Sequence, residues 1–202
     1  MIHHILKSIS FIFHPLMMPL LGVLFYFSKT PRYIPDPIIK AKVFSISILT
    51  IVLPILLFYL LKTLKKINSF YLETTQERIL PLILNTLIIA LIIYRVLTHN
   101  EIVELYYFFI GILCSTIACL ILAILNFKAS IHMIASAGFF MFAVALGIHY
   151  KININGTIAL MSIIIGAIAT SRLHLKAHTG IELTIGFFIG LIPQLIMLNY
   201  WL

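Results

Sequence analysis

Long apolar runs separated by short polar connections dominate the chain. Each run has the roughly 17 to 25 residues that an α-helix needs to cross ~30 Å of hydrocarbon. Lipid offers the backbone no hydrogen-bond partner, so helices that satisfy their own backbone groups are favoured there. The pattern predicts an all-α polytopic transmembrane helical bundle of seven spans, with six as the alternative. The expected spans are residues 8–28, 40–62, 80–97, 103–126, 131–149, 156–171 and 179–200.

The composition fits one membrane domain and leaves no stretch for a soluble one. Of 202 residues, 62% are hydrophobic and 10% are charged, which is far from the balance of a soluble domain. We therefore expect a single integral membrane domain over residues 1–202. The N-terminal MIHHILK precedes a long apolar run without a small-residue cleavage site, which predicts a retained first span.

The net charge of +8 points to the membrane surface. Lys and Arg near span ends interact with anionic head groups, so membrane lipids are the expected partners. No basic stripe with interleaved aromatic residues indicates nucleic-acid binding. Cys114 and Cys119 lie inside an apolar run and are expected to be small core residues. The oligomeric state is left open.

Polar residues gather in the second, fourth and sixth connections between spans. Two spans separate each of these connections from the next, so all three are expected on one side of the membrane, here called the active face. Its polar residues are Glu77, Arg78, Lys128, Ser130, His132, Arg172, His174, Lys176, His178 and Glu182. The opposite face carries the sparser set Asp36, Arg95, His99, Glu101, Glu104 and Lys151.

The distribution of Lys and Arg does not identify the cytoplasmic side. The active face has eight of these residues and the opposite face has six. Without the candidate site residues Arg78, Lys128 and Arg172, five remain against six. The positive-inside rule therefore leaves the orientation open.

The sixth connection holds the strongest chemical signal. If the last helix begins near Ala177, His178 and Glu182 lie at i and i+4 on one face. The carboxylate then accepts a hydrogen bond from one imidazole nitrogen and leaves the other as a directed nucleophile or base. Arg172, just before the turn, has the planar fork that suits bidentate phosphate binding.

The second and fourth connections add cations and a second histidine. Lys128 and His132 have helical spacing, with Ser130 between them, and a helix that starts here presents its free N–H groups to the active face. Arg78 comes shortly before Pro81 at the start of a span. Three cations, two histidines and one carboxylate on one face indicate histidine chemistry on an anionic substrate.

At these residues the chain resembles the type 2 phosphatidic acid phosphatase superfamily. Residues 171–182, read as SR-x5-H-x3-E, resemble its third motif, SR-x5-H-x3-D. The ASIH of residues 129–132 resembles the second motif, PSGH, and the ERILP of residues 77–81 resembles the end of the first, K-x6-RP. KASIH, and SRLHLKAHT with the following Glu and GFFIG, are similar to small membrane proteins of this superfamily from Bacteroidetes-type bacteria. The resemblance covers about residues 76–190, a phosphatase-like core.

The resemblance implies a metal-independent phosphatase in a bacterial inner membrane, without a cofactor, acting on a lipid phosphate or polyprenyl (pyro)phosphate. By that resemblance His178 attacks phosphorus and forms a phosphohistidine, and Glu182 orients it. His132 protonates the leaving oxygen and then activates water. The phosphoryl oxygens are held, and the developing charge is stabilised, by Arg78, Lys128, Ser130, Ser171 and Arg172.

The chain departs from the family pattern at several positions. Tyr71 stands seven residues before Arg78, where the first motif has Lys, and Glu182 replaces the Asp of the third motif. Ala129 and Ile131 replace the Pro and Gly of the second motif. Two spans separate the first motif from the second, whereas membrane members of the family carry both on one loop. A catalytically inactive, phosphatase-like protein that binds or transports anionic lipids is therefore the alternative.

Three local patterns have a second interpretation. His174, His178 and Glu182 also form H-x3-H-x3-E, but the third group lies ~12 Å along the axis from the first, and we expect no metal site. The His178–Glu182 pair also fits a purely structural contact at a helix end. Gly186 and Gly190 form GxxxG, which predicts close helix packing, with self-association as an option. His14, within the first span, is not assigned to the site.

Overall fold

The computed structural model describes residues 2–68, 72, 74–98 and 101–202, and its regular elements are helical. Backbone hydrogen bonding within each apolar run explains this architecture, because lipid cannot satisfy an open strand edge. The elements are α1 (Ile2–Ile12), the 3-10 turn η1 (Pro15–Met17), α2 (Met18–Lys29), α3 (Asp36–Ser47), the π-helical η2 (Ile48–Val52), α4 (Leu53–Thr63), α5 (Thr75–Arg95), α6 (Val103–Ile124), α7 (Ile131–His149), α8 (Asn155–His174), α9 (Gly180–Met197) and the 3-10 turn η3 (Leu198–Tyr200).

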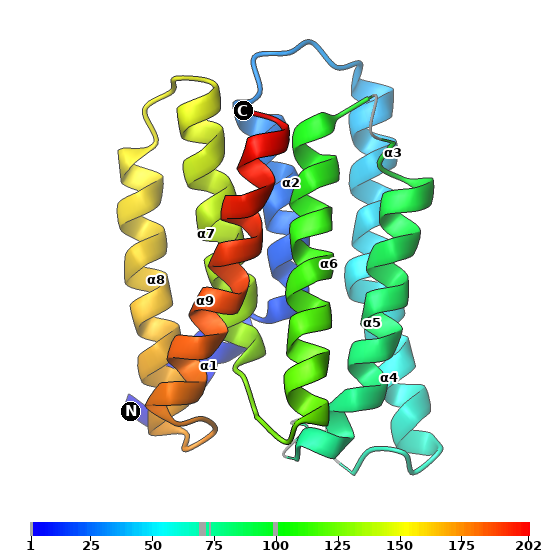
Figure 1. Ribbon diagram of the computed structural model, residues 1–202, viewed down its shortest axis with the longest axis vertical. Coiled ribbons are helices and arrows are strands. Elements are labelled where there is room, and N and C mark those ends of the chain that lie inside the picture. Colours follow the sequence, from blue (N-terminus) through cyan, green and yellow to red (C-terminus); the bar gives the residue numbers. More distant parts are fainter. Residues whose placement is uncertain (1, 69–71, 73, 99–100) are drawn as a thin grey trace.

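Seven helical segments within the described residues are long and apolar enough to cross a membrane. They are His3–Lys29, Asp36–Thr63, Thr75–Arg95, Val103–Ile124, Ile131–His149, Asn155–His174 and Gly180–Tyr200. The predicted all-α bundle of about seven spans is confirmed, and the chain is an integral membrane protein. The α4–α5, α6–α7 and α8–α9 connections lie at one end of the bundle with the N-terminus, and the C-terminus lies at the other (Figure 1). The active face is therefore a single end of the molecule.

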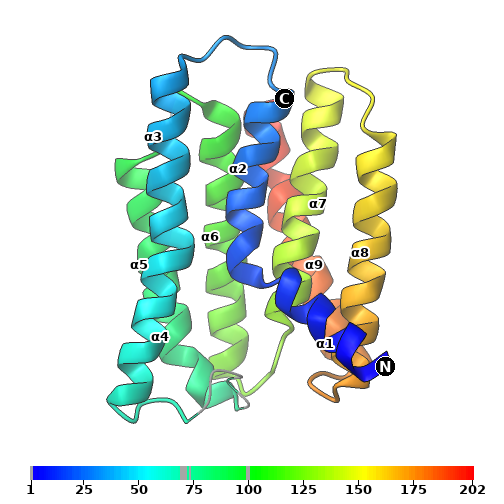
Figure 2. The same cartoon turned by 180° about the vertical axis from the view of Figure 1, so that it is seen from behind.

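The first span is broken rather than continuous, which the apolar pattern did not predict. Pro15 has no N–H and its ring crowds the carbonyl four residues earlier, so the helix stops before it. After this break α1 leaves the axis of α2 and lies against α8 (Figure 2). The hydroxyl of Ser171 donates to the carbonyl of Leu6 at 2.6 Å and lies 2.7 Å from the hydroxyl of Ser10. These contacts hold α1 on α8.

The second span also changes its geometry, at the π-helical turn η2. Pro54 follows this turn and has no N–H to donate to the carbonyl of Thr50. The backbone widens here, and the N–H of Leu53 donates to the carbonyl of Ile48 instead. Such turns often mark functional positions in helices. Thr50 lies in the wall of the cavity described below.

The central helix is α7, which crosses α9 at very short range. No Cβ fits at Gly190, where it would overlap the carbonyl oxygen of Ile134, and a Cβ at Gly186 would lie 2.8 Å from the carbonyl oxygen of Ser130. Helices in lipid associate through close packing, since lipid tails are as apolar as the helix surfaces. The predicted GxxxG contact is thus made inside the bundle, and it draws the start of α9 onto the start of α7.

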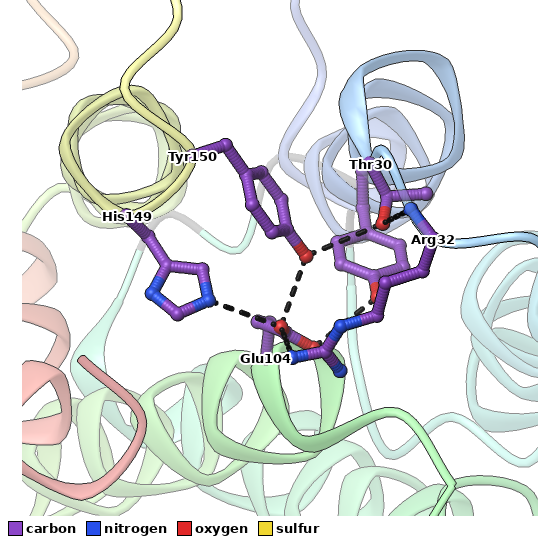
Figure 3. A network of polar contacts seen from close by, with 6 residues as sticks. Thr30, Arg32, Glu104, His149 and Tyr150 are labelled. Carbon is purple, nitrogen blue, oxygen red and sulfur yellow. Dashed lines mark hydrogen bonds and ion pairs between the residues drawn. The ribbon is translucent and has the colours of Figure 1, made fainter.

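A buried carboxylate is the centre of a network of polar contacts at the opposite end of the bundle (Figure 3). The side chain of Glu104 on α6 is 1% exposed and pairs with the half-exposed Arg32 at 2.8 Å. The hydroxyls of Tyr26 and Tyr150 donate to it at 3.2 and 2.9 Å, and the Nε2 of His149 lies 3.4 Å away. Burial raises the pKa of the Tyr150 phenol, which therefore stays protonated and keeps donating. The cluster joins the loop between α2 and α3 to the helices α2, α6 and α7.

The α7–α9 contact leads to a test with a matched control. We expect Gly190→Ala to lower the free energy of unfolding by about 1 to 3 kcal/mol, because the new methyl overlaps backbone that cannot move freely. Gly166 on α8 has nothing within 4 Å of its Cβ position, so Gly166→Ala should be neutral or slightly stabilising. Thermal unfolding in detergent micelles measures both. Equal stability of the two variants would contradict the close contact.

The cluster around Glu104 makes a second stability prediction. Glu104→Leu should destabilise the protein by about 3 kcal/mol, because Tyr26, Tyr150 and Arg32 lose their shared acceptor. The control is Glu101→Leu, which removes an exposed carboxylate paired with Lys42 at 2.7 Å and should cost less than about 1 kcal/mol. Fluorescence of Trp201, the chain's single tryptophan, reports the transition, and a loss no larger than that of the control would refute the role of Glu104.

Candidate active site

The α8–α9 turn is built from helix-end chemistry. Lys176 adopts a left-handed conformation, with φ of 50°, and this ends α8, as a residue of positive φ commonly does. The N–H of Ala177 then donates to the carbonyl of Arg172 at 3.1 Å and folds the chain back on the helix. Thr179 caps α9, and its side chain and that of Glu182 form a capping box. The turn thereby places Glu182 one turn from His178.

The histidine and carboxylate of this turn are directly bonded. The Nδ1 of His178 lies 3.0 Å from a carboxylate oxygen of Glu182, and the same oxygen accepts the backbone N–H of Thr179 at 2.9 Å. A carboxylate can only accept, so Nδ1 carries the proton in the neutral ring. The remaining nitrogen, Nε2, then keeps a free lone pair. The predicted pair is present. The same carboxylate caps the start of α9 and fixes the proton position on the imidazole.

Burial controls the protonation of His178. The residue is 7% exposed, and burial lowers the pKa of its imidazole from 6.5 to about 4. The positive charges of Arg78 and Arg172 also lower it, against the opposing effect of Glu182. The ring is consequently neutral near pH 7, which is the state that a nitrogen nucleophile requires.

The start of α7 packs against this turn. The backbone N–H of Ser130, the residue before α7, donates to the carbonyl of Glu182 at 3.2 Å, a contact that the glycine crossing permits. His132 follows in the first turn of α7, and its Nε2 lies 3.2 Å from the carbonyl of Ser10 on α1. That carbonyl only accepts, so Nε2 is protonated and Nδ1 is free to accept a proton.

A third histidine joins the site at the break in the first span. The ring of His14 lies 5.7 Å from that of His132, centroid to centroid. Its Nδ1 accepts the backbone N–H of Leu16 at 3.4 Å, which caps the turn that Pro15 begins. Both histidines line the same cavity.

Two arginines supply positive charge without a carboxylate partner among the described residues. Arg78 is 5% exposed and donates to the carbonyls of Leu72 and Ala129 at 3.0 and 2.9 Å. The Nε of Arg172 is buried and has no hydrogen-bond partner among the described residues. A guanidinium that is buried or half-buried with no negative group to balance its charge is costly. Both side chains line the cavity, so an anion that enters it would offset this cost.

The cavity links these groups. It has a volume of about 210 Å³ and is lined at its polar end by His14, Arg78, His132, Arg172 and His178. One water needs roughly 10 to 15 Å³ by the same measure, so the space suits a larger ligand. The rest of the lining is mainly apolar and comes mostly from α2, α4, α5, α6 and α7, with single residues or pairs from η1, η2 and α9. Cationic groups at one end of an apolar space favour an anionic amphiphile.

The other predicted phosphate ligands lie beside this cavity rather than in its wall. Ser171 uses its hydroxyl to hold α1, as described above. Lys128 is half-buried in the α6–α7 connection. The Oγ of Ser130 is buried without a partner among the described residues. Of the five predicted phosphate ligands, Arg78 and Arg172 reach the cavity.

The H-x3-H-x3-E residues do not converge. His174 ends α8, where its exposed ring lies 5.7 Å from the ring of His3, whereas His178 pairs with Glu182. Within the described residues no group of three or more His, Cys, Asp or Glu side chains is arranged to hold a metal ion.

Sequence reasoning missed His14, Ser10 and Asn85 as parts of the site. The signal for His14 is a histidine directly before a proline inside an apolar run, since a helix break there exposes polar backbone. Asn85 follows Arg78 by seven residues, which is two helical turns and hence the same helix face. For Ser10, whose carbonyl binds His132, the sequence holds no comparable signal.

Comparisons of the chain with known family models, with curated proteins and with solved structures find no match.

The tautomer of His178 can be measured directly. We expect 15N NMR to show a neutral ring with its proton on Nδ1 from pH 8 down to about pH 5. Glu182→Leu should shift the proton toward Nε2, because the acceptor is gone. Thr179→Ala, which removes only the cap hydroxyl, should leave the tautomer unchanged. An Nε2-protonated ring in the unaltered protein would contradict the assignment.

The lowered pKa of His178 also predicts how the stability of the folded protein changes with pH. Between about pH 4 and pH 6.5 the unfolded chain binds more protons at this residue than the folded one. The contribution of His178 therefore makes the folded state less stable as pH falls through this window.

Proposed function

We propose that the protein is a membrane-embedded phosphatase that removes phosphate from a lipid phosphate or polyprenyl (pyro)phosphate through a phosphohistidine intermediate. The resemblance of residues 171–182 to the third motif of the type 2 phosphatidic acid phosphatases supports this proposal. The observation that carries it is the His178–Glu182 pair beside two arginines that have no carboxylate partner among the described residues. Lipid binding alone has no need for a tautomer-fixing carboxylate.

In the first step the Nε2 lone pair of His178 attacks phosphorus, and the bond between phosphorus and the lipid oxygen breaks. Glu182 stabilises the positive charge that develops on the imidazole. Arg78 and Arg172 stabilise the negative charge on the phosphoryl oxygens. The leaving oxygen takes a proton from Nδ1 of His132. Nδ1 of His132, which is free before the lipid binds, takes up this proton from the acid form of the substrate phosphate as it enters the site.

In the second step water attacks the phosphohistidine and the bond between nitrogen and phosphorus breaks. His132 now accepts a proton from the attacking water at Nδ1. Inorganic phosphate leaves and His178 returns to its neutral form. The net reaction consumes one water and yields a lipid alcohol and phosphate, or a polyprenyl monophosphate and phosphate where the substrate is a pyrophosphate.

The cellular setting belongs to the same proposal. The similarity to small membrane proteins of Bacteroidetes-type bacteria favours the bacterial inner membrane. The substrate reaches the site from the head-group level at the active face, where the N-terminus and three connections gather.

The decisive test is phosphate release by the purified protein in detergent micelles. Phosphatidic acid, phosphatidylglycerol phosphate and undecaprenyl pyrophosphate are the substrates, with EDTA present. We expect release from at least one of them, no release by His178→Ala, and a loss of about 10²- to 10⁴-fold in kcat for Glu182→Gln with lipid binding retained. A radiolabel that is stable in alkali and labile in acid would mark the phosphohistidine.

The matched control is His174→Ala, which removes an exposed histidine from the same face without touching the cavity. Its activity should equal that of the unaltered protein. If folded protein releases phosphate from none of the lipids but binds them, the cationic cavity serves lipid binding or transport, and the phosphatase proposal is wrong.

A further inference from the structure

The cavity does not end at the cationic groups but continues into the bundle. On α5 its lining runs from Arg78 to Ile89, a rise of about 16 Å along the helix. That is about half of the ~30 Å hydrocarbon core. Phe108 and Gln194 also line it. A phosphate bound at the arginines would thus stand at the mouth of a deep, mainly apolar space.

Most of the polar side chains along this inner space already donate a hydrogen bond to a backbone carbonyl. The hydroxyl of Thr50 donates to the carbonyl of Ile46 at 2.8 Å, and that of Thr116 donates to the carbonyl of Ile112 at 2.8 Å. The amide of Gln194 donates to the carbonyl of Phe108 at 2.9 Å. Groups bonded in this way present little polarity to a ligand, so the inner walls suit hydrocarbon.

Asn85 is the exception. It lines the cavity on α5, about 10 Å deeper than Arg78 along the helix, and its half-buried amide makes no hydrogen bond to the residues that the structure describes. An amide offers two donors and an acceptor. Placed among apolar side chains, it can bind a single polar group of a ligand.

From these features we propose that the space below the arginines is a chamber for one hydrocarbon chain of the lipid substrate, with Asn85 bonded to an ester, amide or hydroxyl group of its linker. The inference rests on the proposed phosphatase function for the identity of the head group. It favours a glycerol- or sphingoid-type lipid phosphate over a polyprenyl phosphate, whose chain has no polar group below the phosphate.

Filling the chamber gives the first test. Ala135 lines the cavity on α7, so Ala135→Phe should reduce kcat/KM for phosphatidic acid more than tenfold. Hydrolysis of p-nitrophenyl phosphate, which has no chain, should persist. The control is Ala159→Phe, the same change at an exposed position of α8, which should alter neither activity. Unchanged turnover of phosphatidic acid by the filled, folded variant would overturn the chamber.

Asn85→Leu tests the polar contact while keeping a similar side-chain shape. Loss of one hydrogen bond corresponds to about a three- to tenfold fall in kcat/KM for phosphatidic acid. Undecaprenyl phosphate should be affected much less. An equal fall for both substrates, or none for either, would remove the role assigned to Asn85.

A binding experiment separates failure of the chamber from failure of the phosphatase. Phosphatidic acid with a photoreactive diazirine in its acyl chain should label chamber residues such as Leu84, Ile88 and Ile112, and Ala135→Phe should abolish that labelling. This result is expected whether or not the protein hydrolyses lipids. Labelling confined to outward-facing residues such as Leu87 and Leu91 would refute the chamber even if the phosphatase reaction is found.

Discussion

The backbone contact between α7 and α9 is the constraint on which the active face depends. At Gly186 and Gly190 the two helices approach too closely for any side chain. That approach permits the hydrogen bond from Ser130 to the carbonyl of Glu182, which places the first turn of α7 beside the turn that carries His178. Helices in lipid gain little from hiding apolar surface from one another, so tight packing of this kind sets their relative positions.

The candidate site is assembled from helix ends and breaks. His178 precedes α9, His132 lies in the first turn of α7, and His14 stands at the break before α2. Helix ends leave backbone groups unpaired, and the chain uses these groups to fix the imidazoles. Arg78 lies in the first turn of α5, where the helix dipole is also positive. This placement strengthens the attraction for an anion beyond what the side chain provides.

The sequence predicted the spans and the common face well, because hydrocarbon thickness and backbone hydrogen bonding govern both. It also predicted the bonded His178–Glu182 pair, but α9 begins at Gly180 rather than near Ala177, so the pair forms across the helix start and not along one helix face. It did not predict which cations enter the cavity. Ser171 looks like a phosphate ligand by motif, yet its hydroxyl holds α1, a contact across most of the chain length. Glu104 looked like one of several scattered charges because its partners come from three separate segments: α2, the loop between α2 and α3, and the end of α7.

The cluster around Glu104 bears on whether a molecule could pass through the bundle from one side of the membrane to the other. Between it and the deepest cavity residues lies a packed layer that includes Phe109, Phe142 and Leu146. This layer closes the cavity toward the Glu104 end of the bundle. Moving a head group across the bilayer through this bundle would require that layer to separate and the buried carboxylate to lose its partners together.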